Sequence, residues 1–214
     1  MNKGEETRQR IIEQAAPLFN VRGYEGCSIQ NVMDATGLEK GGIYRHFESK
    51  EELAAEAFDF AWSNVSESRR RQLDTIPNHV DRLKQHIANF ATRARFPGGC
   101  PLLNTAVYAG NGTANDSGSG NPVLRERVQK ALRGWQQMLG EIVEDGKRAG
   151  TIRREVDACT LANLMIGSIE GAMLVGRIED SDSPIRDMVE HLSEYLETRV
   201  RKREAPSSYS WMTR

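Results

Sequence analysis

The chain has 214 residues, of which 38% are apolar and 28% are charged, and its formal net charge is −1. This composition is typical of a soluble globular protein, and it excludes collagen, low-complexity disorder and a membrane bundle. The even charge balance excludes a strongly basic nucleic-acid coat, but it leaves a local basic face open. Three cysteines argue against a disulfide scaffold and for a reducing compartment. The first ten residues lack the apolar core of a signal peptide, so we expect a cytoplasmic protein.

Apolar residues recur at helical spacing almost everywhere, and no convincing strand pattern is present. The sequence therefore predicts an all-α fold of about nine helices. Their expected ranges are 7–22, 28–36, 39–47, 49–71, 80–94, 101–109, 122–149, 157–178 and 184–200. Thr7 is expected to cap the first helix and Gly23 to end it.

Two later segments have distinct compositions. Residues 110–121 are rich in glycine, asparagine and serine, and we expect a flexible surface loop there. The most apolar stretch, 161–178, is interrupted by polar residues and glycines, whereas a bilayer span needs about 20 mostly apolar residues. We therefore expect a buried helix rather than a membrane span.

Residues 28–47 form the most informative segment. A helix of about eight residues, a turn containing Gly37 and a second short helix make a helix-turn-helix pattern, whose second helix lies in the DNA major groove. Gly41 and Gly42 each cost about 1 kcal/mol against alanine inside a helix, so neighbours must hold this helix through Ile43 and Phe47. The bare backbone could approach DNA closely. The alternative is that the glycines form a loop and Tyr44 is packing.

The chain from Thr7 to about Val65 resembles the DNA-binding domain of the TetR family of bacterial transcriptional repressors. The residues that carry the resemblance are Thr7-Arg8, Ile11-Ile12, Phe19, Gly23-Tyr24, Ser28-Ile29, Val32, Thr36-Gly37-Leu38 and above all the string from Lys40 to Leu53, KGGIYRHFESKEEL. The resemblance implies an all-α homodimer with an N-terminal three-helix helix-turn-helix head and a larger C-terminal helical body for ligand binding and dimerisation. We expect a DNA-binding domain at 5–65, with its motif at 28–47, a ligand-binding and dimerisation domain at 66–203, and a frayed tail at 204–214. Glu39 departs from the family, which usually has a small capping residue there.

On this resemblance we expect the DNA-binding residues to be Ser28, Gln30, Lys40, Gly41, Gly42, Tyr44, Arg45, His46 and Lys50. Hydroxyl and ammonium groups of Ser28, Tyr44 and Lys50 would contact phosphates. Gln30, Lys40 and Arg45 would read base edges, and His46 would contact a phosphate or pack. Each of these side chains alone is usually solvated surface. Residues 1–50 carry seven basic and seven acidic residues, so we expect binding to need two heads on a palindrome.

The string from Phe96 to Ala106 resembles one found in a TetR subgroup whose members often regulate efflux or enzymes that handle small aromatic or reactive molecules. We expect a ligand pocket among large and adaptable side chains, although core packing is the alternative for each of them. The candidates are Phe90, Phe96, Cys100, Leu103, Tyr108, Trp135, Met138, Met165, Glu170 and Met173. Glu170 needs a partner, which could be a second subunit, a cationic ligand or a group of its own bundle.

Cys100 has two interpretations. It lies near a helix N-terminus, where a thiolate is favoured, and it could sense oxidants or electrophiles. Alternatively, it is a small buried hydrophobic residue. Cys27 and Cys159 have no comparable setting.

The last two long helices are expected to form a homodimer interface. Gly167 and Gly171 lie four residues apart on one helix face, where they permit close approach, and the last helix would add Met188, Leu192 and Leu196.

The leading hypothesis is a repressor that binds double-stranded operator DNA as a homodimer and is released by a small-molecule inducer, aromatic or electrophilic. No cofactor, metal or membrane partner is expected. One alternative is a helical small-molecule enzyme or binding protein, but the four histidines and three cysteines show no metal-site or nucleophile-elbow spacing. Another is a non-specific architectural DNA-binding protein, which the neutral head disfavours.

Overall fold

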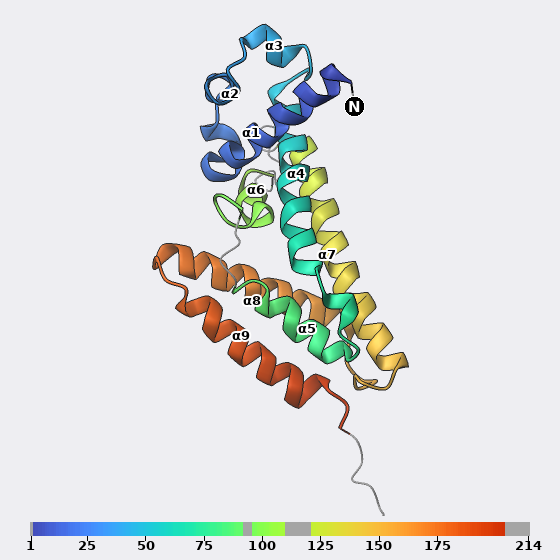
Figure 1. Ribbon diagram of the computed structural model, residues 1–214. Coiled ribbons are helices and arrows are strands. Elements are labelled where there is room, and N and C mark those ends of the chain that lie inside the picture. The colour runs from blue at the N-terminus through green and yellow to red at the C-terminus, as the bar shows by residue number, and fades with distance from the viewer. Residues whose placement is uncertain (1, 92–95, 110–120, 204–214) are drawn as a thin grey trace, which may run out of the picture. The chain divides into compact units, whose positions relative to one another are not determined.

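The computed structural model describes residues 2–91, 96–109 and 121–203, without the side chains of 107–109. Within these ranges every regular element is helical and one isolated antiparallel bridge joins Ile152 and Arg201, so the predicted all-α class is confirmed (Figure 1). The helices are α1 (Lys3–Gly26), α2 (Ile29–Thr36), α3 (Lys40–Tyr44), α4 (Lys50–Arg70), α5 (His79–Ala88), α6 (Pro101–Ala109), α7 (Pro122–Arg148), α8 (Ala158–Ile178) and α9 (Ser183–Tyr195). A 3-10 turn follows α4 at Leu73–Thr75, and a π-helical turn follows α9 at Leu196–Val200.

The chain divides into two compact units. The first combines Met1–Arg71 with Thr92–Trp135, and the second combines Gln72–Ala91 with Gln136–Arg214. This division differs from the predicted boundary at residue 65 because α6 packs on α1 and α4 and so belongs to the first unit. The assignment of separate functions to 5–65 and 66–203 stays a prediction. Nearly all of the predicted surface loop and the whole predicted tail lie outside the described residues.

Small side chains let α1 and α4 pack closely in the first unit. Ala15 and Ala16 of α1 are buried, as are Ala54, Ala57 and Ala61 of α4. Alanine-lined faces bring two helix axes near one another, and larger neighbours then fill the remaining space. Helix α2 packs on α1 of this pair, and α3 packs on α2.

Local signals set the ends of α2 as predicted. The Ser28 hydroxyl accepts a hydrogen bond from the Asn31 backbone N–H, and the Asn31 side chain accepts one from the Ser28 backbone, which completes a capping box. Gly37 ends the helix in the left-handed conformation, with φ 68°, which glycine adopts without steric cost. The turn that aims α3 is therefore determined by residues within it.

Other helix ends differ from the prediction. The first helix begins at Lys3, because the Asn2 side chain caps it, and Thr7 lies inside the helix with its hydroxyl bonded to the Lys3 carbonyl. Gly23, with φ 73°, interrupts α1 as expected, but one further turn continues to Gly26. The third helix ends at Tyr44 rather than at residue 47, and α5 ends at Ala88 rather than at residue 94.

The second unit places α9 against α8 and α5. The last helix was expected to offer Leu192 and Leu196 to a second subunit; both pack within this chain instead, and their part in an interface stays a prediction. Their side chains are 7% and 0% exposed because they pack inside their own unit. Met188 is half-buried.

Helix α8 is buried on one side only, whereas a buried helix was predicted. Leu161, Met165 and Ile169 point into the unit, but Val175 and Ile178 are 42% and 75% exposed. Among the residues described, α8 is the one helix long and apolar enough to cross a membrane by length and composition. Instead of a core helix with no free side, α8 has apolar residues on both sides, and one of these sides is uncovered within the residues described.

Alanine substitutions at two glycines of the second unit should have opposite effects on stability. A Cβ at Gly176 would lie 2.7 Å from the Ser181 carbonyl oxygen, while a Cβ at Gly140 would meet no atom within 4 Å. We expect Gly176→Ala to lower the free energy of unfolding by about 1–3 kcal/mol through overpacking. Gly140→Ala should raise it by about 1 kcal/mol through helix propensity. Urea unfolding followed by circular dichroism measures both, and equal effects of the two substitutions would contradict the packing described.

Candidate nucleic-acid interface

Helix α3 is held by two buried side chains and presents the others outward. Ile43 is 0% exposed and Phe47 is 2% exposed, while Tyr44 is 39% exposed and Arg45 is also exposed. Gly41 and Gly42 are helical rather than part of a loop. A Cβ at Gly41 would meet no atom within 4 Å, so the outer side of the helix is open to a large partner.

Arg8 of α1 ties this outward helix to its support. Its guanidinium lies 4.6 Å from the centre of the Phe47 ring and donates to Glu56 and, at 3.3 Å, to Glu52 of α4. The Glu56 hydrogen bond raises the pKa of Arg8 above its ordinary value. Arg8 also donates to the carbonyl oxygen of His46 at 3.4 Å, and the His46 side chain is half-buried. One cation thus connects α1, α4 and the end of the α3 segment.

Two predicted DNA contacts are already hydrogen-bonded within the protein. The Ser28 hydroxyl donates to the Asn31 side-chain oxygen at 3.0 Å, and the Ser28 backbone N–H does so at 2.9 Å. The Gln30 amide donates to Asp34 at 2.8 Å. A phosphate at Ser28 or a base at Gln30 would have to replace these internal bonds, which lowers the net gain of each contact.

Lys50 begins α4 at a fixed position. Its ammonium lies 4.3 Å from the centre of the Tyr24 ring, in a cation–π contact. The Tyr24 hydroxyl donates to Glu51. Burial is the main cause that raises the pKa of Tyr24, and this hydrogen bond raises it further. The same bond lowers the pKa of Glu51. On α3, the Lys40 ammonium makes a similar contact and lies 5.9 Å from the centre of the Tyr44 ring.

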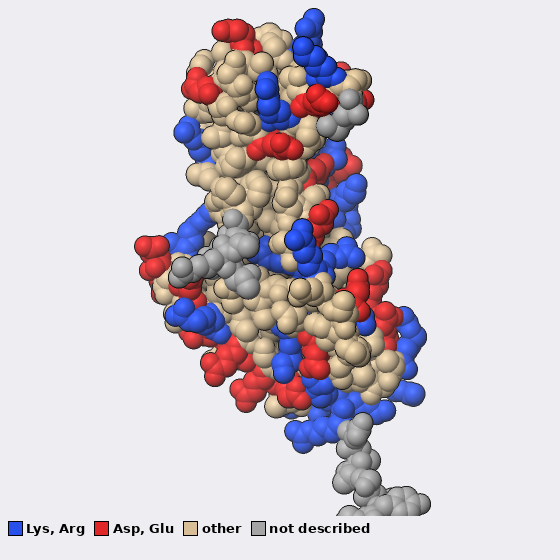
Figure 2. All heavy atoms as spheres, in the orientation of Figure 1, with Lys and Arg blue, Asp and Glu red and all other residues tan. Residues whose placement is uncertain are grey.

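Charges of both signs are mixed on the head. Figure 2 shows lysine and arginine side chains beside acidic ones on the visible face of the first unit's N-terminal helices. The balance agrees with the equal numbers of basic and acidic residues in 1–50. Electrostatic attraction to any DNA is therefore modest, and placement of individual donors must supply most of the discrimination.

The ten residues predicted to line a ligand pocket divide between the two units. The first unit contains Phe96, Cys100, Leu103, Tyr108 and Trp135, and the second contains Phe90, Met138, Met165, Glu170 and Met173. The buried ones are Phe90, Cys100, Trp135, Met165 and Met173. Phe96, Leu103, Met138 and Glu170 are half-buried, and the Tyr108 side chain lies outside the described residues. The buried positions agree with the core-packing alternative.

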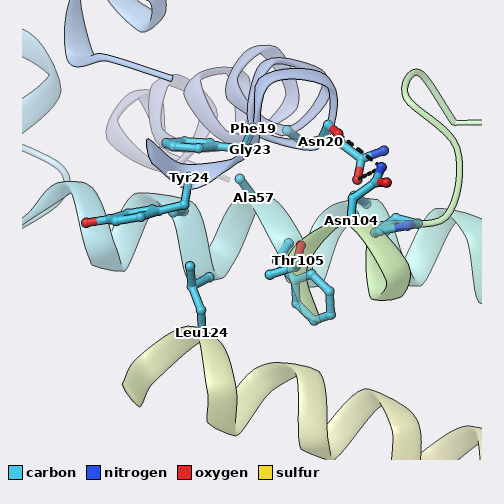
Figure 3. Close-up of a pocket in the computed structure, with 13 residues that line it drawn as sticks. Phe19, Asn20, Gly23, Tyr24, Ala57, Asn104, Thr105 and Leu124 are labelled. Carbon is cyan, nitrogen blue, oxygen red and sulfur yellow. Dashed lines mark hydrogen bonds between the residues drawn. The ribbon is translucent and has the colours of Figure 1, made fainter. Parts of the chain in front are cut away.

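The first unit contains a cavity that none of these ten residues lines. It lies between α1, α4 and α6, with Leu124 of α7 closing one side, and Asn20, Tyr24 and Asn104 supply its polar groups (Figure 3). Its volume is about 20 Å³, which is room for one water molecule. Sequence reasoning missed these residues, although Asn20 interrupts the apolar face of α1 directly after Phe19.

A second hollow, an open groove of about 270 Å³, separates α4 from α7 in the same unit. Trp62 lines it and packs on Trp135 with ring centres 5.8 Å apart. Arg127 bonds Asp59 across the groove at 2.7 Å, while burial raises the pKa of Asp59.

The three cysteines differ in accessibility. Cys27 and Cys100 are buried and Cys159 is exposed. Burial raises the pKa of the Cys27 thiol. The Cys100 side chain is 3% exposed, which agrees with the packing interpretation, and sensing by this thiol stays a prediction.

Tyr24→Phe should show a pH-dependent loss of stability. In the folded protein the pKa of Glu51 lies below its ordinary value of 4.5. The hydrogen bond from Tyr24 to ionised Glu51 therefore stabilises the fold at pH values above 4.5, and this stabilisation is lost as the pH falls through the pKa of the folded protein. We expect a lower Tm than wild type at pH 7 and a difference that narrows below pH 4.5. Thermal unfolding between pH 7 and 3 measures this, with Tyr195→Phe on α9 as the exposed control. A difference that is constant over the range would contradict the assignment.

Comparison with known proteins agrees with this geometry. Residues 11–57 match the profile described as "Bacterial regulatory proteins, tetR family", and residues 78–192 match "Tetracyclin repressor-like, C-terminal domain". The HTH-type transcriptional repressor DhaR of Mycobacterium sp. (strain GP1) is 28% identical over 181 residues, which cover 83% of this chain and 86% of that protein.

Solved structures give the same result. A TetR transcriptional regulator from Chloroflexus aurantiacus is 44% identical, with a TM-score of 0.85 over 95% of this chain and 100% of that chain. A cysteine mutant of the TetR family regulator CifR, complexed with a 26-bp double-strand operator DNA, is 21% identical, with a TM-score of 0.75 over 87% of this chain and 94% of that one. The latter likeness shows the fold alone.

Proposed function

The chain belongs to the TetR family of bacterial transcriptional regulators, and within that family we propose that it is a ligand-responsive repressor that binds a palindromic operator as a homodimer. The observation that carries the proposal is α3, a helix anchored by Ile43 and Phe47 with Tyr44 and Arg45 exposed on its outer side. A helix presented in this way fits the major groove. The similarity to DhaR, which is named a repressor, supports repression over activation.

The predicted DNA-binding side chains divide into two proposed roles. Tyr44, Ser28 and Lys50 contact phosphates and set the register of the head on the duplex. Arg45, Lys40 and Gln30 read base edges, with arginine to guanine the commonest specific pairing. Gly41 and Gly42 leave the backbone bare for close approach, and His46 contributes less because its side chain is half-buried.

The uncovered side of α8 is the observation that favours a dimer. Gly167 and Gly171 are exposed and have open space above them, and the exposed apolar residues Leu164, Leu174, Val175 and Ile178 lie on the same side. An apolar stripe of this size is costly to leave in water, and a second copy covers it by two-fold symmetry. The glycines permit close approach of the partner helix. We place this interface on α8, with Met188 of α9 beside it.

Release of the operator completes the proposal. A small molecule, aromatic or electrophilic, favours a conformation of the body that changes the spacing of the two heads, and such coupling is typically about 1–3 kcal/mol. Its pocket is proposed within the second unit, among the predicted side chains Phe90, Met138, Met165, Glu170 and Met173. In this proposal the protein acts in the cytoplasm without a cofactor, and the similarity to a named transcriptional repressor supports a regulator over an enzyme.

Arg45→Ala should weaken operator binding by about ten- to a hundredfold, because a bidentate contact to guanine is worth about 1–3 kcal/mol. Tyr44→Phe should weaken binding to all sequences alike. Mobility shifts with the chain's own upstream promoter DNA and a scrambled competitor, at two salt concentrations, measure both effects. Arg133→Ala, an exposed arginine on α7, is the control. Unchanged binding by Arg45→Ala would contradict its role, and no preference over scrambled DNA by wild type would contradict the repressor.

Val175→Glu should convert the dimer to a monomer at micromolar concentration, because it places a charge in the centre of the proposed interface. Light scattering measures the mass of wild type and variant. Gln137→Glu on α7 introduces the same group at an exposed position away from α8. A monomeric wild type, or a dimer that survives Val175→Glu, would contradict the interface.

A further inference from the structure

Asn20 is a buried polar residue at the point where α1 meets the segment that precedes α6. Its side chain is 6% exposed. Its amide nitrogen donates to the carbonyl oxygen of Pro97 at 2.6 Å and to that of Gly99 at 3.1 Å. Both partners belong to the loop that leads into α6, so one side chain of the DNA-binding head holds two backbone positions 77 and 79 residues away.

Asn104 of α6 completes the contact from the other side. Its amide nitrogen lies 3.0 Å from the Asn20 carbonyl oxygen, 3.1 Å from the Asn20 side-chain oxygen and 2.8 Å from the Gly98 carbonyl oxygen. The two amides point toward one another in Figure 3, where dashed lines join them. Every hydrogen-bonding atom of the Asn20 side chain therefore has a partner across the contact.

The loop passes so close to α1 that it requires glycine. Gly98 has φ +85°, which other residues rarely adopt, and a Cβ there would lie 2.9 Å from the Asn20 carbonyl oxygen. The amide pair and the glycine thus specify the same close approach. A shift along α1 would leave buried amide groups without partners, at a cost of about 1–3 kcal/mol for each group.

Apolar packing at this contact is less specific than the amide pair. The cavity of about 20 Å³ lies directly beside it, lined by Phe19, Ala57 and Thr105 among others. Contacts around a void lose part of their dispersion energy and tolerate small movements. Directional hydrogen bonds do not tolerate such movements, so the amide hydrogen bonds determine the orientation of α1 on α6.

We propose that Asn20 and Asn104, with Gly98, form a latch that fixes the orientation of the DNA-binding head on α6, and that these residues are positioning residues for operator recognition. They do not contact DNA. Their effect on recognition rests on the proposed dimer, because two heads of fixed orientation accept one distance between half-sites. A head released from α6 samples several orientations and accepts half-sites at several distances.

The spacing of operator half-sites tests the latch. Asn20→Asp keeps the shape of the side chain, removes both N–H donors and places a carboxylate against the carbonyl oxygens of Pro97 and Gly99. The matched control is Asn64→Asp on α4, because Asn64 is exposed and its amide bonds only the Phe60 carbonyl of its own helix. Affinities are measured for operators whose half-sites are moved apart or together by one and two base pairs.

Wild type and Asn64→Asp should bind the shifted operators about tenfold more weakly or worse. The affinities of Asn20→Asp for operators of all these spacings should lie within about threefold of one another. A variant with the wild-type preference for one spacing would overturn the latch, because a merely structural role lowers stability without changing that preference. Asn104→Ala, which removes the donor without adding charge, replaces Asn20→Asp if the latter does not fold.

A distance measurement separates failure of the latch from failure of the proposed function. Spin labels are attached to cysteines introduced at Ala35 of α2 and Ala106 of α6, both exposed, in a Cys159→Ser background diluted with unlabelled protein. Without DNA, the wild type should give one narrow distance distribution and Asn20→Asp a broad one. Equal widths would overturn the latch whatever the DNA results. Broadening in a protein that binds no operator would contradict the proposed function and leave the latch supported.

Discussion

Burial of Ile43 and Phe47 is the constraint on which the proposed DNA-binding surface depends. Helix α3 has five residues, two of them glycine, and a helix of that length is unstable in isolation. Tertiary contacts therefore supply its stability, and the same contacts fix which side faces outward. Exposure of Tyr44 and Arg45 follows directly from burial of their neighbours. A segment with better intrinsic helix propensity would need less support, but it would present more side-chain bulk where Gly41 leaves the surface bare.

The support for α3 is itself built from long-range contacts. Alanines of α1 and α4 bring those helices together, and Arg8 joins both to Phe47 through ion pairs and a cation–π contact. The amides of Asn20 and Asn104 then set α1 on α6. In the second unit, the uncovered side of α8 has no such support within the residues described, and the proposed dimer would account for its glycines and its apolar side chains together.

Signals confined to a few residues made much of the fold predictable from the sequence. Ser28, Gly37 and Asp157 cap or end their helices at the boundaries expected from the sequence, because each acts on backbone groups within four residues. The third helix was predicted too long, since its pattern of Ile43 and Phe47 continues through a turn. The burial of Leu196 and the partnership of Asn20 with Asn104 depend on residues far away in the chain. Periodicity marks such side chains as facing inward or as unusual, but it does not identify what they face.

Hydrogen exchange of the 214-residue chain, free and bound to its operator duplex, tests the outward presentation of α3 most directly. The backbone amides from Ser28 to Lys50 should exchange more slowly when the operator is bound, and a scrambled duplex at the same concentration should leave them unchanged. Protection should be strongest from Gly41 to Arg45, where the backbone is expected to approach the duplex. Operator binding that leaves this segment unprotected and slows exchange elsewhere in the chain would contradict the account.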